Sequence, residues 1–132
     1  MKQEIQTAFE EMMDISSDIG KAIVSDSTGV LASNMAEEAQ GAAVSQAQEL
    51  VRLGETRAAE MGSQPFTQLV VETPSGYVFL SRELNADGMT VLATGKKGSR
   101  VGLVLYDLKT CLRDARGAAT ADAPKVRKKK EE

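Results

Sequence analysis

Residues 66–94, FTQLVVETPSGYVFLSRELNADGMTVLAT, contain three β-prone runs separated by two short polar turns. The runs cover residues 66–73, 77–82 and 89–94, and the turns are Pro74-Ser75-Gly76 and Asn85-Ala86-Asp87-Gly88. Turns of this length join neighbouring antiparallel strands, and Gly, Pro, Asn, Asp and Ser are the residues that they favour. The stretch therefore predicts a three-stranded antiparallel meander.

Upstream of the meander, residues 21–26 and 30–33 flank a polar turn that contains Gly29, and they predict a β-hairpin. Apolar residues at helical spacing predict helices over residues 3–14, 36–62 and 99–116. For the middle helix, we expect Asn34 as N-cap, Glu37 as its capping-box partner and Gly62 as the stop. The predicted order is α-β-β-α-β-β-β-α. It indicates an α/β (α+β) fold with a five-stranded antiparallel sheet between helices.

The composition fits one domain over residues 3–117, followed by a disordered charged tail over residues 118–132. The tail carries a net charge of +2 and the rest −5, and this acidic body argues against nucleic-acid binding. The chain has no His and one Cys, which excludes His-based catalysis and common zinc sites. Carboxylate, Lys or Tyr chemistry is not excluded by the composition. The single Cys and the lack of an apolar run of about 20 residues predict a cytoplasmic protein. We predict a non-enzymatic protein with no catalytic residues, cofactor or metal, for which membrane contact is not expected.

The middle helix has an apolar arc of about 200°, although packing on one sheet needs only about 100°. The centre of this arc comprises Ala43, Ala47, Leu50, Val51, Gly54, Ala58 and Met61. One side continues through Ala39, Ala42 and Leu53, with Gln46 and Arg57 among them. The part of the arc that the sheet does not need could pack against a second helix. Alternatively, the helix could be deeply buried in a monomer and rich in Ala only because Ala is the best helix former.

Several other features carry a functional and a structural interpretation. Residues 95–99, Gly-Lys-Lys-Gly-Ser, precede a helix and could hold an anion, but they lack phosphate-loop spacing and also read as a turn. Cys111 lies on the apolar stripe of the last helix, which favours a buried thiol over a nucleophile.

The lysines near the C-terminus could contact an acidic partner or membrane, or remain solvated. Asp14, Asp18 and Asp26 lack the spacing of a metal loop.

Taken together, the segments resemble the Roadblock family of dynein light chains and their bacterial and archaeal relatives. The matching segments are DIGKAIVSDSTGVLASN, AEEAQGAAVSQAQELVRLGETRAAEMG, QLVVETPSGYVFLSREL, TVLATGKKG and SRVGLVLYDL, within residues 5–116. The resemblance implies a profilin-like sandwich, homodimers formed by the middle helices and adjacent strands, and a Ras-like small GTPase as partner.

On this basis we assign a dimer interface to Ala39, Ala42, Gln46, Leu53 and Arg57, and a partner-binding rim to Glu38, Glu49, Arg57 and Glu60. The leading hypothesis is a homodimeric regulator or docking partner of a GTPase. The alternatives are a scaffold subunit of a motor or kinase signalling complex, and a small-molecule sensor. The sequence nominates no arginine finger, since nothing singles out one of its arginines.

Overall fold

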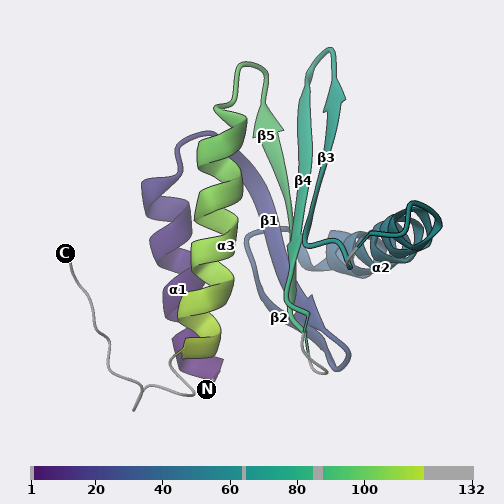
Figure 1. Ribbon diagram of the computed structural model, residues 1–132. Helices are drawn as coiled ribbons and strands as arrows, with labels where there is room; N and C mark the ends of the chain where they lie inside the picture. The colour runs from purple at the N-terminus through teal and green to yellow at the C-terminus, as the bar shows by residue number, and fades with distance from the viewer. Residues whose placement is uncertain (1, 64, 85–87, 118–132) are drawn as a thin grey trace.

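The computed structural model describes residues 2–63, 65–84 and 88–117 (Figure 1). The eight elements follow the predicted order. They are α1 (Lys2–Ile15), β1 (Ile19–Asp26), β2 (Gly29–Ser33), α2 (Glu37–Glu60), β3 (Gln68–Thr73), β4 (Gly76–Arg82), β5 (Thr90–Lys96) and α3 (Val101–Gly117).

The five strands form one sheet in the order β2-β1-β5-β4-β3, and every neighbouring pair is antiparallel. The meander pairs β3 with β4 and β4 with β5, as its short turns predicted. The N-terminal hairpin joins it through β1 and β5, where Val24 lies opposite Val91 and Ser25 opposite Thr90. The predicted five-stranded antiparallel sheet is confirmed, and β2 and β3 are its edges.

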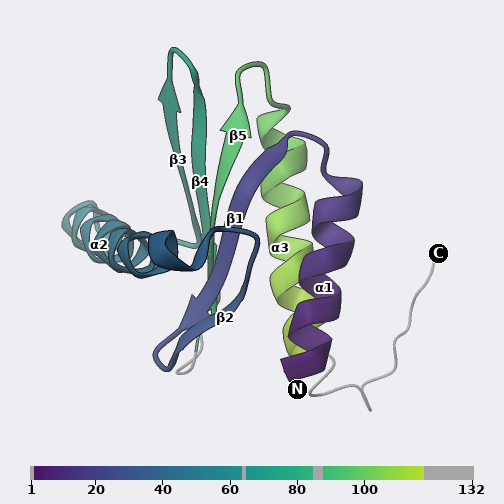
Figure 2. The ribbon, with the colours of Figure 1, turned by 180° about the vertical axis from the view of Figure 1, so that it is seen from behind.

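The helices lie on both faces of the sheet, with α1 and α3 side by side on one face and α2 alone on the other (Figures 1 and 2). The larger core fills the space under α1 and α3. Phe9, Phe79, Val104 and Leu108 are buried there. The smaller core lies under α2, where Ala43 and Ala47 meet side chains of β1, β4 and β5. The single helix thus covers its sheet face thinly.

The predicted capping box at the start of α2 is wrong. The helix begins at Glu37 after Ala36, and no side chain caps it. Asn34 instead bridges to β1, because its Oδ1 accepts the Ala22 N–H at 2.8 Å and its Nδ2 donates to the Gly20 carbonyl at 2.9 Å. An Asn side chain can hydrogen-bond to the backbone of a strand as well as to a helix end, and Asn34 bonds to the strand.

The C-terminal stop of α2 is confirmed. Gly62 has φ +72°, its N–H bonds to the Ala59 carbonyl, and the Ser63 N–H bonds to the Ala58 carbonyl. These bonds form a Schellman ending, which favours Gly at the left-handed position. Met61 was expected on the buried side, but it follows the last helical residue and is 64% exposed.

The predicted tail, residues 118–132, lies outside the described residues. Within the described ranges, no helix combines the length and apolar character that a membrane span requires.

Candidate protein-interaction surface

The residues assigned to the dimer interface lie on one exposed flank of α2. Ala39, Ala42, Gln46, Leu53 and Arg57 are all exposed. They are positioned together because residues three, four and seven apart share a side of a helix. Leu53 is the largest apolar side chain of the set, and it is 51% exposed. This flank is the surplus part of the apolar arc, and the sheet does not cover it.

An apolar groove of about 330 Å³ runs beside this flank. Gln46, Glu49 and Leu50 line it from α2, and Val71, Val78 and Leu92 line it from β3, β4 and β5. Next to it, β3 forms a sheet edge whose outer backbone groups have no strand partner in the described chain. The exposed flank, the groove and the free edge together form a continuous surface, which we call the α2–β3 surface.

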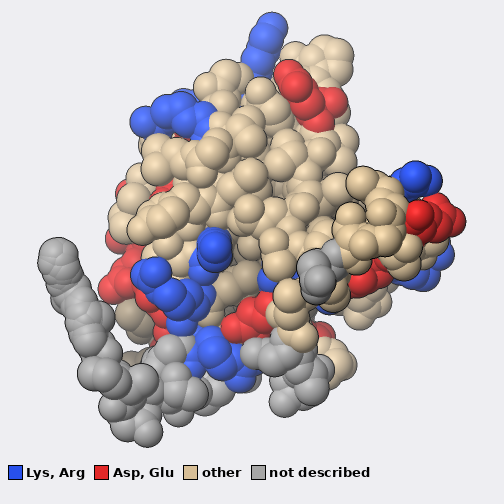
Figure 3. Space-filling view, viewed as in Figure 1, with Lys and Arg blue, Asp and Glu red and all other residues tan. Residues whose placement is uncertain are grey.

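The residues assigned to the partner-binding rim are also exposed, and most of them are already paired. Glu49 forms an ion pair with Arg52, whose hydrogen bond and charge lower the pKa of the Glu49 carboxyl. Arg57 Nη1 lies 3.0 Å from Glu60 Oε1. Glu38 has no such partner among the described residues. The rim therefore alternates in charge instead of being uniformly acidic, and Figure 3 shows both signs at the end of α2.

A contact that the sequence analysis did not identify anchors the C-terminal half of α2. Glu55 forms an ion pair with Arg82 of β4, and the Arg82 guanidinium lies 5.0 Å from the centre of the Phe66 ring. That ring packs directly on Gly54, where a Cβ would lie 2.6 Å from Phe66 Cε1. A glycine inside a long helix was the available signal, since it often marks close approach of another group.

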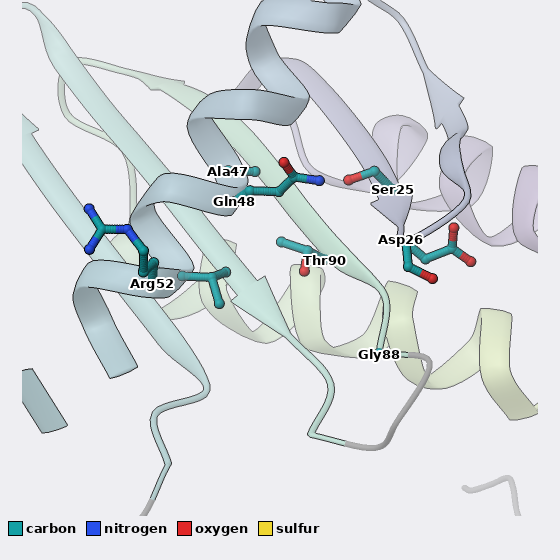
Figure 4. Close-up of a pocket in the computed structure, with 9 residues that line it drawn as sticks. Ser25, Asp26, Ala47, Gln48, Arg52, Gly88 and Thr90 are labelled. Carbon is teal, nitrogen blue, oxygen red and sulfur yellow. The ribbon is translucent and has the colours of Figure 1, made fainter. Parts of the chain in front are cut away.

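The opposite flank of α2 borders a second cavity, of about 300 Å³ (Figure 4). Ser25 of β1 and Thr90 of β5 are cross-strand partners at its base, and Ser25 is only 5% exposed. The Gln48 side chain extends from α2 toward Ser25, whereas Arg52 points away (Figure 4). Hydroxyl and amide groups can hydrogen-bond a small polar ligand. Asp26 also lines the cavity, and its carboxylate already accepts hydrogen bonds from Thr28.

The loop that could have held an anion is a turn closed by an internal carboxylate. Asp18 Oδ2 accepts the Arg100 backbone N–H at 2.9 Å and its Nε at 3.1 Å, and Lys96 Nζ lies 3.5 Å from Oδ1. The Arg100 backbone N–H is the main cause of the lowered pKa of Asp18. A carboxylate of the chain itself therefore occupies the start of α3, where an anion would bind.

The remaining candidate groups have structural surroundings. Cys111 is 3% exposed, and burial, followed by the charges of Asp114 and Glu11, raises its pKa to about 12. Such a thiol is unreactive at neutral pH. Asp26 accepts the N–H and hydroxyl of Thr28 in the β1–β2 turn. In the described residues, no three acidic, Cys or His side chains lie together as metal ligands would.

The element order, the sheet topology and the lone helix on one face define the Roadblock/LC7 fold. Solved structures share it, whereas no family model and no curated protein matches the sequence. The Roadblock/LC7 domain from Streptomyces avermitilis has a TM-score of 0.75 at 14% identity, over 87% of this chain and 97% of that chain. MglB from Myxococcus xanthus gives 0.71 at 13% identity, over 96% and 95%. The gliding protein MglB from Thermus thermophilus gives 0.71 at 16% identity, over 89% and 90%.

Proposed function

We propose that the protein is a non-catalytic cytoplasmic homodimer that binds and regulates a Ras-like small GTPase. The observation that supports the dimer most strongly is the α2–β3 surface. A half-exposed Leu53, an apolar groove and a free strand edge adjoin one another there. A second copy would bury Leu50 and Leu53 of α2 and Val71 of β3 and would extend the sheet across the edge. That arrangement agrees with the pairing that the Roadblock resemblance implies.

Leu53→Glu tests the dimer, because it would place a charge in a contact from which water is excluded. The matched control is Ala59→Glu, which adds the same charge to an exposed position on another side of α2. We expect sedimentation velocity at micromolar concentration to give a dimer for the wild type and for Ala59→Glu, and a monomer for Leu53→Glu. A monomeric wild-type protein would refute the dimer, and a dimeric Leu53→Glu variant would exclude this flank.

The GTPase partner follows from the Roadblock resemblance and from the position of the rim. Glu38 and Glu60 are exposed next to the proposed dimer flank, whereas Glu49 lines its groove and Arg57 is assigned to both the flank and the rim. A partner bound at this margin could contact both subunits. Charged rims steer partners mainly through the association rate. The sequence offers no phosphate loop, and we expect the isolated protein neither to hydrolyse GTP nor to bind it at micromolar concentration in calorimetry.

The test is titration with the cognate GTPase in its GTP-bound and GDP-bound states. We expect tighter binding of the GTP state. We also expect weaker binding on reversing Glu49 and Arg57 together (Glu49→Lys with Arg57→Glu), in a variant that sedimentation velocity shows is still a dimer, because both residues border the proposed dimer flank. Glu10→Lys with Lys109→Glu is the matched control, since it reverses two exposed charges on α1 and α3, across the sheet from α2. Equal affinity for both nucleotide states would remove the regulatory role and leave the scaffold hypothesis.

A further inference from the structure

The side of the sheet that faces α2 changes from apolar to polar between two neighbouring rows of side chains. The apolar row is buried in the smaller core and comprises Ile23, Leu92 and Leu80. Two positions along each strand, on the same face, Ser25 lies opposite Thr90 and Thr90 lies opposite Arg82. Arg82 is already held by Glu55 and by the Phe66 ring. Ser25 and Thr90 therefore remain as a polar floor beneath α2.

The cavity of about 300 Å³ lies between this polar row and α2 (Figure 4). Ala47, Gln48 and Val51 line it from α2. Ala47 is buried and Val51 is half-buried, so the cavity has apolar walls from α2 besides the Gln48 amide and the two hydroxyls of the sheet. A few polar groups set among apolar walls are typical of sites for small molecules.

The hydroxyl of Ser25 is buried at this cavity without a hydrogen-bond partner among the described residues. Ser25 is 5% exposed, and its side chain points toward Gln48 (Figure 4). The side chains of Gln48 and Thr90 also form no hydrogen bond within the described chain. Buried polar groups are nearly always hydrogen-bonded, because leaving one without a partner costs free energy. A molecule bound in the cavity would supply that partner.

The side chains that point into the cavity are uncharged. Arg52 forms an ion pair with Glu49 and points away from the cavity (Figure 4). The Asp26 carboxylate accepts the N–H and the hydroxyl of Thr28, and it points away from Gln48 (Figure 4). A charged molecule would thus leave water without gaining an opposite charge, which is costly. The cavity therefore suits a neutral molecule.

We propose that the cavity binds a small uncharged molecule with a carboxamide or lactam edge. The Gln48 amide carries a donor and an acceptor side by side, and the C=O and N–H of a second amide complement both. The hydroxyls of Ser25 and Thr90 can each donate or accept a further hydrogen bond, and the rest of the molecule packs on Ala47 and Val51. At about 30 Å³ for each water-sized group, the volume suits about ten non-hydrogen atoms.

A molecule bound in this way joins α2 to β1 and β5, which supply the polar floor. The cavity lies on the flank of α2 opposite Leu53, so the proposed dimer leaves it open. The inference therefore does not depend on the proposed function.

The experiment is a titration of the full chain with benzamide, followed through the backbone amide signals in NMR spectra. Benzamide has about the required size, and benzoate carries a charged carboxylate on the same ring in place of the amide. We expect benzamide to shift the signals of Ser25, Gln48 and Thr90 with a dissociation constant of about 1 mM, and benzoate to bind about tenfold more weakly or less. No shifts with benzamide at about 10 mM, or equal binding of benzoate, would overturn the proposal.

Gln48→Leu and Thr90→Val remove hydrogen-bonding groups and keep similar side-chain sizes. Each should weaken benzamide binding about tenfold, which corresponds to one lost hydrogen bond. Gln6→Leu is the matched control, since it makes the same change on α1, across the sheet from the cavity, and it should leave the dissociation constant unchanged. Equal weakening by Gln6→Leu, or none by Gln48→Leu, would contradict the assigned site.

Ser25→Ala distinguishes a ligand-binding hydroxyl from a structural one. Because the hydroxyl has no partner in the described chain, the variant without benzamide should unfold at the wild-type temperature or above it, while its benzamide binding weakens about tenfold. Thermal unfolding is the assay here, since urea is itself a small neutral amide. A lower unfolding temperature would show that the hydroxyl stabilises the fold, and either that result or unchanged binding would overturn the proposal.

Discussion

Gly54→Ala is the substitution whose outcome the structure specifies most closely. A Cβ at position 54 would lie 2.6 Å from Cε1 and 2.7 Å from Cζ of Phe66, whereas carbon atoms in contact are about 3.5–4.0 Å apart. The ring must shift by about 1 Å, and the shift disturbs its contact with the Arg82 guanidinium. Overpacking costs about 1–3 kcal/mol, and losing the cation–π contact about 0.5–1 kcal/mol.

Helix propensity partly offsets this cost, because replacing Gly by Ala inside a helix raises the free energy of unfolding by about 1 kcal/mol. The net expectation is a destabilisation of about 0.5–3 kcal/mol. Gly41→Ala is the control within the same helix, since a Cβ there meets nothing within 4 Å. It should stabilise the protein by about 0.5–1 kcal/mol.

The assay is equilibrium urea unfolding followed by far-UV circular dichroism, at one protein concentration so that any dimer contributes equally. A Gly54→Ala protein as stable as Gly41→Ala would refute the packing argument. Repeating Gly54→Ala in a Phe66→Ala background removes the ring, and Ala at position 54 should then become stabilising.

Three further outcomes follow from buried groups. Gly76→Ala should cost about 3 kcal/mol or more in urea unfolding, because φ is +156° and the Cβ would lie 2.4 Å from the Gly95 carbonyl oxygen, which cannot rotate away. In the folded protein at pH 8, Cys111 should react with iodoacetamide far more slowly than the same thiol in urea, since its pKa is raised to about 12; equal rates would disprove its burial. The folded-state pKa of Asp18 is depressed, so its stabilisation is complete above the pKa of an unfolded Asp, about 3.9, and is lost as the pH falls through the lower folded value. The stability difference between wild type and Asp18→Asn should therefore shrink only in acid, and a difference independent of pH would contradict the role of the carboxylate charge.

Local patterns in the sequence were sufficient to predict most of the fold. Short turns such as Pro74-Ser75-Gly76 leave adjacent strands only the antiparallel hairpin, and the helical stripe through Val104, Leu108 and Cys111 identified the buried side of α3. The pairing of β1 with β5 joins residues some seventy positions apart, and no local pattern predicted how the hairpin and the meander meet.

The contacts missed by the sequence analysis depend on positions in three dimensions. Asn34 satisfied a standard N-cap pattern, yet its amide pairs with β1, since cap and strand offer it similar hydrogen bonds. Asp18 accepts the Arg100 N–H at the start of α3 although the two residues are 82 positions apart, and no local sequence pattern predicts this contact. The exposure of Leu53 was predictable from the width of the apolar arc, whereas the groove beside it required the sheet to be in place.

The strand order also constrains how the protein can fold during its synthesis. During synthesis β1 emerges early, but its partner β5 is completed only at Lys96, and α3, which covers the larger core, follows still later. Until then β1 has a strand partner on one edge only, the short β2 strand, although Val24 can already pack on α1 and Ile23 on α2. Strand pairings between segments distant in the sequence form slowly, and apolar surface and unpaired strand edges stay exposed until they do. The sheet therefore cannot close until residues up to Lys96 have been synthesised. A chain stalled before residue 90 would leave one edge of β1 unpaired and prone to aggregation.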